Sequence, residues 1–523
     1  MPKPIQPSTS TFRDLIEGGF LYVDKTEHIY QLVRDAKGVY FLSRPRRFGK
    51  SLLISTLEEV FKGNKELFQG LWIYDSDYDW QSYPVIHIDF STKPVCNAKE
   101  LESAIQTHLK RVAEDYGLSF NEGTTIQLDD LILALVKSAA AVDMDTSRVV
   151  ILIDEYDKPI LDNLDDIEEA KRIQRVMKGF YTAVKALDRY IRFVFITGVS
   201  KFTRVTIFSE LNHLVDLTMR TTFGTALGLT EPELRDNFSE HIGEFAVQEE
   251  MTDEELLDKI RFWYNGFCFA PNAENVYNPF STMQLFHAKQ FDDYWFQSGT
   301  PTFLIKQIHK EMFDVEDFET EKYTARAFDS FNIERLALVP LLFQTGYLTI
   351  KNYDKRSSRY TLGFPNHEVE TAFLTSLIDE FGYQDQGYSA KQLWALIDAL
   401  ESHDLDTFFV GVQALFADID YNLHLDYEKY YQTIFYLTFK FLGLNIQVEP
   451  TTNVGRIDAV ITLEDHIYLF EFKINKSAQE ALDQILTKKY YEKYLAQSKP
   501  ITLVGANFST AAKGLDDWKS KSL

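Results

Sequence analysis

The sequence predicts an α/β protein, with an N-terminal domain built on a parallel sheet, a helical segment after it, and a second α/β domain at the carboxyl end. Three observations lead to this prediction. Gly49-Lys50-Ser51 follows an apolar strand, the pair Asp154-Glu155 ends another, and acids and a lysine recur along two strands near the C-terminus. Each places chemically useful side chains at the end or on one face of a strand.

The first element is a phosphate-binding loop. Gly38–Leu42 predicts a buried strand and Leu52–Leu57 predicts a helix, which is the strand, loop, helix context that such a loop requires. The chemistry needs convergent backbone N–H groups, a lysine for the terminal phosphates and a hydroxyl for magnesium. Arg44 departs from the general pattern GxxxxGK[ST], which has glycine at this position. The candidate nucleotide-binding residues are Arg46, Arg47, Phe48, Gly49, Lys50, Ser51 and Leu52, with Ser51 also a magnesium ligand.

Two further strands complete the nucleotide site. Val149–Ile153 ends in Asp154, a candidate magnesium ligand, and in Glu155, a candidate base for the attacking water. Ile191–Ile196 ends in Thr197, which either senses the terminal phosphate between the other two strands or belongs to a plain turn. Arg46, Arg47 and Arg204 are candidates for neutralising transition-state charge, or equally for binding solvent or a partner.

Length and composition bound the remaining possibilities. A chain of 523 residues is too long for one core and suggests three or four units. No stretch has the length of uncharged sequence needed to cross a bilayer, so we expect neither secretion nor membrane insertion. Cys96 and Cys268 are too few for a disulfide framework, which favours a reducing, cytoplasmic setting. The net charge of −24 argues against wholesale wrapping of nucleic acid and leaves room for a local basic groove.

The periodicity predicts four successive regions. Strands such as Val85–Phe90 alternate with helices up to residue 229, and Thr230 is a predicted helix N-cap. A hairpin is predicted at 348–362, and His367 near the next helix start is expected to be a capping or surface residue. The predicted domains are 1–229, nucleotide binding; 230–347, helical lid; 348–417, hairpin and helical connector; and 418–523, the second α/β domain.

The second constellation lies in the last domain. Glu471 and Lys473 point to the same face of one strand, and a neighbouring strand brings Asp458 alongside. Carboxylates suit magnesium, and a lysine near a metal-bound water assists phosphodiester hydrolysis. Glu449 is a further candidate acid, and a helix predicted over 478–494 presents Gln484 and Tyr490. The alternative is an ordinary edge strand whose Lys473 discourages aggregation.

These residues resemble a known family. Tyr22-Val23-Asp24-Lys25-Thr26, the loop 44–51, Asp154-Glu155-Tyr156-Asp157, Asn265-Gly266 and Tyr277-Asn278-Pro279-Phe280-Ser281 are similar to the bacterial AAA-ATPase-like proteins, whose arginine-rich loop has the form seen here. The tail resembles the PD-(D/E)XK nuclease superfamily. The resemblance covers nearly the whole chain and implies a P-loop NTPase followed by a restriction-endonuclease-like domain. It implies ATP and magnesium at Lys50, Ser51, Asp154 and Glu155, and a nuclease triad of Asp458, Glu471 and Lys473 with Gln484 as auxiliary residue.

The leading functional hypothesis is an ATP-dependent nuclease that acts on foreign or mobile nucleic acid, on DNA rather than RNA, with ATP and magnesium as cofactors. The rival is a nucleotide-driven switch or scaffold whose tail binds nucleic acid or protein without cutting. A small-molecule kinase is disfavoured by the paired Asp154-Glu155 and by the large C-terminal region. The sequence leaves the oligomeric state open, because a ring needs an arginine that acts on the neighbouring subunit and none is identified.

Overall fold

The computed structural model forms two compact units, Met1–Gly299 with Glu319–Glu368, and Thr300–Phe318 with Val369–Leu523. It describes residues 2–120, 125–140, 148–201, 211, 213–297, 304–305, 308, 321–328, 338–381, 388–417, 437–438, 440–442, 447–450, 459–509 and 514–523. Asp458 and Arg204 therefore lie outside the described residues.

The first unit is built on a five-stranded parallel sheet with the order β2-β3-β4-β1-β5. Strand β4 therefore lies between β1, which leads into the phosphate loop, and β3, which ends in the acidic pair. β3 and β4 are buried along their whole length, as expected for a sheet covered on both faces. The strands are β1 (Gly38–Ser43), β2 (Val85–Asp89), β3 (Val149–Asp154), β4 (Ile191–Gly198) and β5 (Val215–Asp216).

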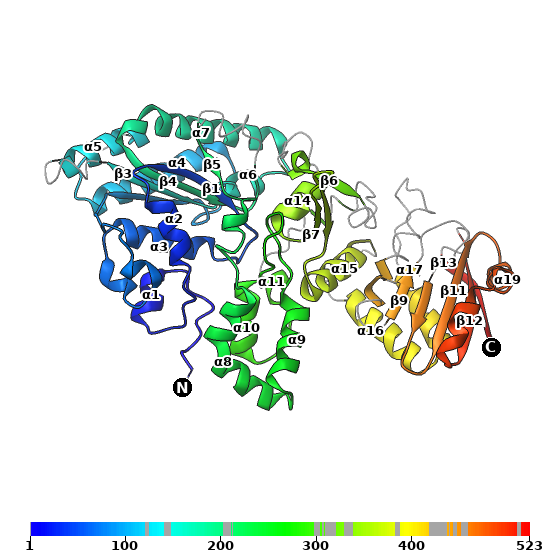
Figure 1. Cartoon of the computed structure of the whole chain (residues 1–523). Coiled ribbons are helices and arrows are strands. Elements are labelled where there is room, and N and C mark those ends of the chain that lie inside the picture. Colours follow the sequence, from blue (N-terminus) through cyan, green and yellow to red (C-terminus); the bar gives the residue numbers. More distant parts are fainter. Residues whose placement is uncertain are drawn as a thin grey trace. The chain divides into compact units, whose positions relative to one another are not determined.

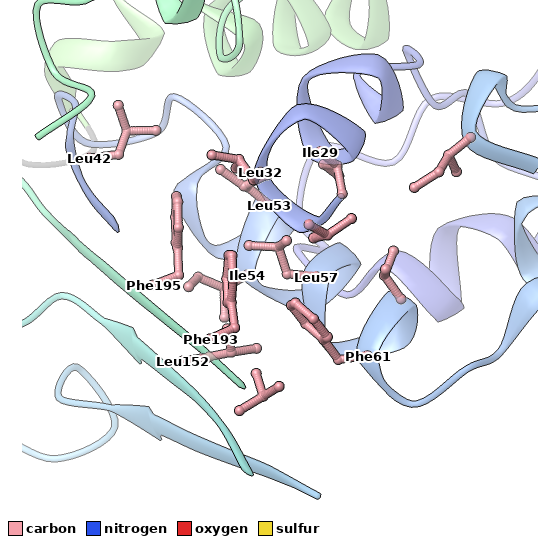
Figure 2. Close-up of a cluster of buried hydrophobic side chains, with 14 of the residues drawn as sticks. Ile29, Leu32, Leu42, Leu53, Ile54, Leu57, Phe61, Leu152, Phe193 and Phe195 are labelled. Carbon is pink, nitrogen blue, oxygen red and sulfur yellow. The ribbon is translucent and has the colours of Figure 1, made fainter. Parts of the chain in front are cut away.

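Helices cover both faces of this sheet (Figure 1). One layer holds α1 (Phe12–Glu17), α2 (Thr26–Val33) and α3 (Lys50–Phe61), and the other holds α4 (Ala98–Asp115), α5 (Leu128–Ala140) and α7 (Ile167–Ala186). Figure 2 shows the core beneath α3, where Ile54, Leu57 and Phe61 face Leu152, Phe193 and Phe195 of the strands. This packing fixes the helix whose first turn carries Lys50 and Ser51.

A mainly helical segment follows within the same unit. Helices α8 (Glu231–Gln248) and α9 (Asp253–Tyr264) each begin with a capping box, at Thr230 and Thr252, so the predicted N-cap at Thr230 is confirmed. The segment continues with α10 (Pro279–Ala288), α11 (Tyr294–Gln297) and α14 (Leu338–Thr345). The predicted hairpin is confirmed as β7 (Thr349–Asp354) and β8 (Arg359–Gly363), which join β6 (Lys322–Thr324) in an antiparallel sheet.

The second unit holds a five-stranded mixed sheet with the order β13-β12-β11-β10-β9. Its central strands β11 (Ile467–Ile474) and β12 (Ile501–Ser509) are parallel, and the other pairs are antiparallel. Helix α19 packs on β11 and β12, and α17 packs on β13. The remaining elements are α15 (His367–Phe381), which begins in the first unit, α16 (Tyr388–Glu401), α17 (Leu405–Ala417), β9 (Gln447–Pro450), β10 (Ala459–Thr462), α19 (Ala478–Lys488) and β13 (Gly514–Ser522).

The predicted α/β fold class is thus confirmed, and two local predictions are wrong. The helix predicted over 478–494 ends at Lys488, because Lys489 adopts a left-handed conformation with φ 55° and closes the helix. Tyr490 lies beyond that end, in the 3₁₀ helix Tyr490–Gln497. His367 is buried rather than at the surface. It stacks on Phe262 and packs edge-on against Trp263, and burial lowers its pKa to about 4.

Candidate functional site

The loop before α3 has the backbone of an anion-binding turn. Gly49 adopts φ +89°, a left-handed conformation that favours glycine, and α3 begins at the next residue. Among the described residues no side chain caps this helix. The N–H groups of its first turn lack acceptors within the helix, so Lys50, Ser51 and Leu52 present donors to an anion at the loop.

The amine of Lys50 is buried within the loop. Its Nζ donates to the carbonyl oxygens of Arg44 at 3.2 Å and Pro45 at 3.0 Å, and lies 3.3 Å from Oε1 of Glu155. The side chain is 3% exposed. Phosphate oxygens that bind this amine must therefore displace at least one of these three oxygens.

The acidic pair lies at the carboxyl edge of the sheet. Asp154 is buried, and its Oδ1 accepts hydrogen bonds from the Thr197 hydroxyl and the Glu155 N–H. Its Oδ2 accepts no hydrogen bond from the described residues. Glu155 adopts φ 50°, which turns the chain sharply and directs its carboxylate to Lys50. Lys50, Asp154, Glu155 and Thr197 are thus brought together from three strand ends.

Asp157 holds the neighbouring loop and was missed by sequence reasoning. Its buried carboxylate accepts hydrogen bonds from the backbone N–H groups of Val199 and Ser200 and from the Ser200 hydroxyl. Burial raises its pKa, and the nearby Glu155 carboxylate adds to the effect. This ties the chain after β3 to the chain after β4. The signal that could have found Asp157 in the sequence is its position three residues after Asp154, next to the acidic pair.

The first arginine of the loop is structural. Arg44 is buried, and its guanidinium donates to the carbonyls of Ser43, Thr218 and Phe223 and lies over the ring of Phe269. The departure from glycine at this position therefore has a physical reason: the side chain ties the loop to the segment after β5.

Other candidate residues of the loop also contact protein. Phe48 is buried against Phe267 and Phe269, with ring centroids 4.8 and 5.1 Å apart, so only its backbone is available to a ligand. Arg47 lies over the ring of Phe280, and the backbone oxygen of Arg46 accepts a hydrogen bond from the Trp295 indole.

An apolar pocket adjoins the loop. It is lined by Gly49 and Leu52 on one side and by Tyr22, Val23 and Leu227 on others. Lys25 is its one charged lining residue in the described chain, and its amine is engaged by the Thr225 carbonyl and the Glu233 carboxylate. The lining of this pocket is therefore mainly apolar.

The motif around Lys25 builds the wall of this pocket. Asp24 accepts hydrogen bonds from the N–H of Thr26 and of Trp72, and the Thr26 hydroxyl accepts one from the N–H of Ile73. These residues fix the start of α2 against the 3₁₀ helix Trp72–Asp75, which is a structural role.

The second constellation is centred on Glu471 of β11. This carboxylate is 1% exposed, and its Oε1 accepts from the amine of Lys473 at 2.7 Å and from the amide of Gln484 on α19. The structure therefore brings three of the predicted residues together. Ala459, the residue after Asp458, pairs with Phe470, the residue before Glu471. Glu449 is described in its backbone alone, opposite Val460. In the described part of the chain no three acidic, histidine or cysteine side chains form a metal cluster.

Comparisons with known proteins gave two family matches and one relative of the full chain. A model described as "Predicted AAA-ATPase" matches residues 7–208, and a model of the PD-(D/E)XK nuclease superfamily matches residues 426–518. A protein of Azotobacter chroococcum mcd 1, described as "Uncharacterized protein in vnfD 5'region", is 35% identical over 532 residues, which covers 100% of this chain and 99% of that protein.

The chain belongs to the AAA-ATPase-like family. This AAA-ATPase-like protein carries a C-terminal domain of the PD-(D/E)XK nuclease superfamily. No helix among its described residues is long and apolar enough to span a bilayer.

Proposed function

We propose that this AAA-ATPase-like protein binds and hydrolyses ATP, and that its C-terminal domain cleaves nucleic acid with a divalent metal. The observation that carries the proposal is the convergence of Lys50, Asp154, Glu155 and Thr197 at the carboxyl edge of one parallel sheet. In the proposed domain arrangement, residues 1–229 bind nucleotide and residues 230–347 form a lid. Residues 348–417 connect this part to residues 418–523, which cleave nucleic acid.

The nucleotide site has hydrogen-bond donors for the phosphates of ATP. These are the N–H groups of the first turn of α3 and the Lys50 amine. The Ser51 hydroxyl and the Oδ2 of Asp154, which accepts no hydrogen bond from the described residues, are the oxygen atoms that would hold magnesium. Bound magnesium supplies charge neutralisation at the phosphates. Glu155 is the proposed base for the attacking water, because its carboxylate reaches the Lys50 amine and hence the phosphate position.

The second site supplies the groups of a metal-dependent phosphodiesterase. Glu471 is the proposed metal ligand. Asp458 is proposed as the second carboxylate, because the next residue, Ala459, pairs with Phe470, the residue before Glu471. Lys473 is the proposed group that assists deprotonation of the attacking water, and Gln484 orients the Glu471 carboxylate. A DNA substrate is proposed over RNA, of foreign or mobile origin.

The test is Mg²⁺-dependent ATP hydrolysis and cleavage of DNA and RNA by the full chain. Lys50→Ala is expected to reduce ATP hydrolysis at least about a hundredfold, because the phosphate charge loses its partner. Lys62→Ala, at the exposed C-cap position directly after the same helix, is the matched control. Glu471→Ala is expected to abolish cleavage without changing ATP affinity. Absence of cleavage by the wild-type protein on every substrate, or unchanged cleavage by Glu471→Ala, rejects the nuclease assignment.

One observation favours the rival function of a nucleotide-driven switch. The Lys50 amine is already ion-paired with Glu155 and hydrogen-bonded to two loop carbonyls, so nucleotide binding must rearrange these contacts, and this rearrangement can act as a switch without hydrolysis. Tight ATP binding without phosphate release, together with nucleic-acid binding without cleavage, would select this function.

A further inference from the structure

The phosphate-binding loop packs against residues 267–346, which follow the parallel sheet in the sequence. Each residue from Arg44 to Phe48 contacts this segment. The contacts are Arg44 with Phe269 (4.4 Å from guanidinium carbon to ring centroid), Pro45 with Gly346, Arg46 with Trp295, Arg47 with Phe280 (4.7 Å), and Phe48 with Phe267 and Phe269. We call this set of contacts the loop clasp.

The polar centre of the loop clasp is Trp295. Its indole Nε1 donates to the backbone oxygen of Arg46 at 2.9 Å, across 249 residues of sequence. Its ring packs against Tyr347 at 5.3 Å and Phe267 at 6.1 Å, and Gly346 lies against both Pro45 and the indole. The indole is therefore fixed on several sides before it meets the loop.

Trp295 is in turn held by a buried carboxyl group. The Trp295 backbone N–H donates to Oε1 of Glu368 at 2.6 Å, and the Ser281 hydroxyl donates to the same carboxyl group at 2.9 Å. Glu368 is fully buried and lies in the first turn of α15, the helix that runs from the first unit into the second. A chain of hydrogen bonds thus joins the start of α15 to the phosphate loop.

This chain fixes the direction of a loop N–H group. A trans peptide unit is planar, and its C=O and N–H point in opposite directions. Holding the oxygen of Arg46 toward Trp295 therefore directs the N–H of Arg47 to the opposite side of the loop backbone. Arg47 also has φ 63°, a conformation that a non-glycine residue adopts at a cost, and an external hydrogen bond is a means to maintain it.

We propose that Trp295, held by Glu368 and Ser281, is a positioning residue for the nucleotide reaction, which sets the shape of the phosphate-binding loop and thereby the affinity for the triphosphate. This inference rests on the proposed ATPase function. In this proposal none of these three residues contacts the reacting atoms. Their effect belongs to nucleotide binding more than to the chemical step, because the loop N–H groups bind phosphates in the ground state as well as in the transition state.

The test is Trp295→Phe, which keeps an aromatic ring against Tyr347 and Phe267 and removes the indole N–H. We expect ATP affinity and 1/KM to fall about fivefold, the effect of losing one hydrogen bond, with kcat changed less than about twofold. Trp394→Phe, at an exposed position of α16, outside the unit that holds the phosphate loop, is the matched control. Equal KM for Trp295→Phe and wild type would overturn the inference.

A second pair of variants covers the case in which Trp295→Phe does not fold. Glu368→Gln keeps an oxygen acceptor of the same size and should retain ATP affinity, whereas Glu368→Leu removes the acceptor and should raise KM at least as much as Trp295→Phe. Similar KM values for these two variants would also overturn the inference. Failure of the wild-type protein to bind ATP refutes the proposed function itself, so the two failures are distinguishable.

Discussion

Glu368 makes folding stability depend on pH. The carboxyl group is fully buried, and burial raises its pKa from 4.5 to about 8, although the Trp295 N–H and the Ser281 hydroxyl act in the opposite direction. The charged and titratable groups that face it are Asp292, Asp293, Tyr264 and Tyr294. At neutral pH the folded protein therefore holds a neutral carboxylic acid at the base of the loop clasp.

The sign and size of the effect follow from linkage. Between pH 4.5 and 8 the folded protein keeps the Glu368 proton and the unfolded chain has lost it, so the free energy of unfolding falls as pH rises. The slope is about 1.4 kcal/mol per pH unit, which amounts to about 5 kcal/mol over the window, and it vanishes above the folded pKa. Glu368→Gln has the shape of the protonated acid and no proton to lose. We expect it to remove this slope and to be the more stable protein at pH 8 by several kcal/mol.

The assay is urea unfolding of wild type and Glu368→Gln, followed by tryptophan fluorescence at half-unit steps from pH 5 to 9. The difference in unfolding free energy between the two proteins should grow with pH up to about pH 8 and then remain constant. Other titrating groups cancel in this difference, because they are common to both proteins. A difference that is independent of pH would refute the reasoning, since it would mean that Glu368 is ionised in the folded state across the range.

Three further outcomes are expected. Gly346→Ala should destabilise the first unit by about 2 kcal/mol or more and raise the KM for ATP, because the added Cβ meets the Pro45 ring at 2.6 Å and φ is +92°. The control Gly117→Ala, with φ +65° and open space around the added Cβ, should lose only the stability that a positive φ costs an alanine and should leave KM unchanged. Gln484→Ala should slow DNA cleavage about tenfold by releasing the Glu471 carboxylate, and Gln479→Ala on the same helix should cleave at the wild-type rate. Glu155→Gln should reduce kcat for ATP by at least about a hundredfold, because the base for the attacking water is lost. ATP affinity should be retained or rise, because the ion pair that competes for Lys50 is lost as well. Separate measurements of kcat and Kd check this, and turnover equal to wild type would contradict the role of Glu155.

Local patterns were sufficient for most of the scaffold. The unbroken apolar run at 149–153 predicted a strand, and the structure has β3 there, buried throughout. Thr230 followed by Glu233 predicted a helix start, and both reciprocal hydrogen bonds of the capping box are present. Such features depend on neighbours within a few residues, which is the range over which sequence periodicity carries information.

Local reasoning failed where the end of an element or the burial of a side chain depends on one residue's backbone conformation or on a partner distant in the sequence. Lys489 resembles any other residue of a helical pattern, but its left-handed conformation ends α19 and moves Tyr490 into a different element. A buried position for His367 was not expected, because its aromatic partners Phe262 and Trp263 lie about a hundred residues earlier. Arg44 appeared to be a departure from a phosphate-loop pattern, and its acceptors Thr218 and Phe223 show a packing role.

The sequence by itself determined the fold class and predicted the candidate residues of both sites, because strand and helix periods and phosphate-loop spacing depend on residues close together in the chain. The tertiary structure alone decided how the loop residues are used: Lys50 against Glu155, Phe48 in an aromatic cluster, and Trp295 and Glu368 behind the loop. The physical reason is that these contacts join segments far apart in the sequence, from 73 residues between Trp295 and Glu368 to 249 residues between Arg46 and Trp295. Their free energy comes from burial and hydrogen bonds that exist only once the chain has folded.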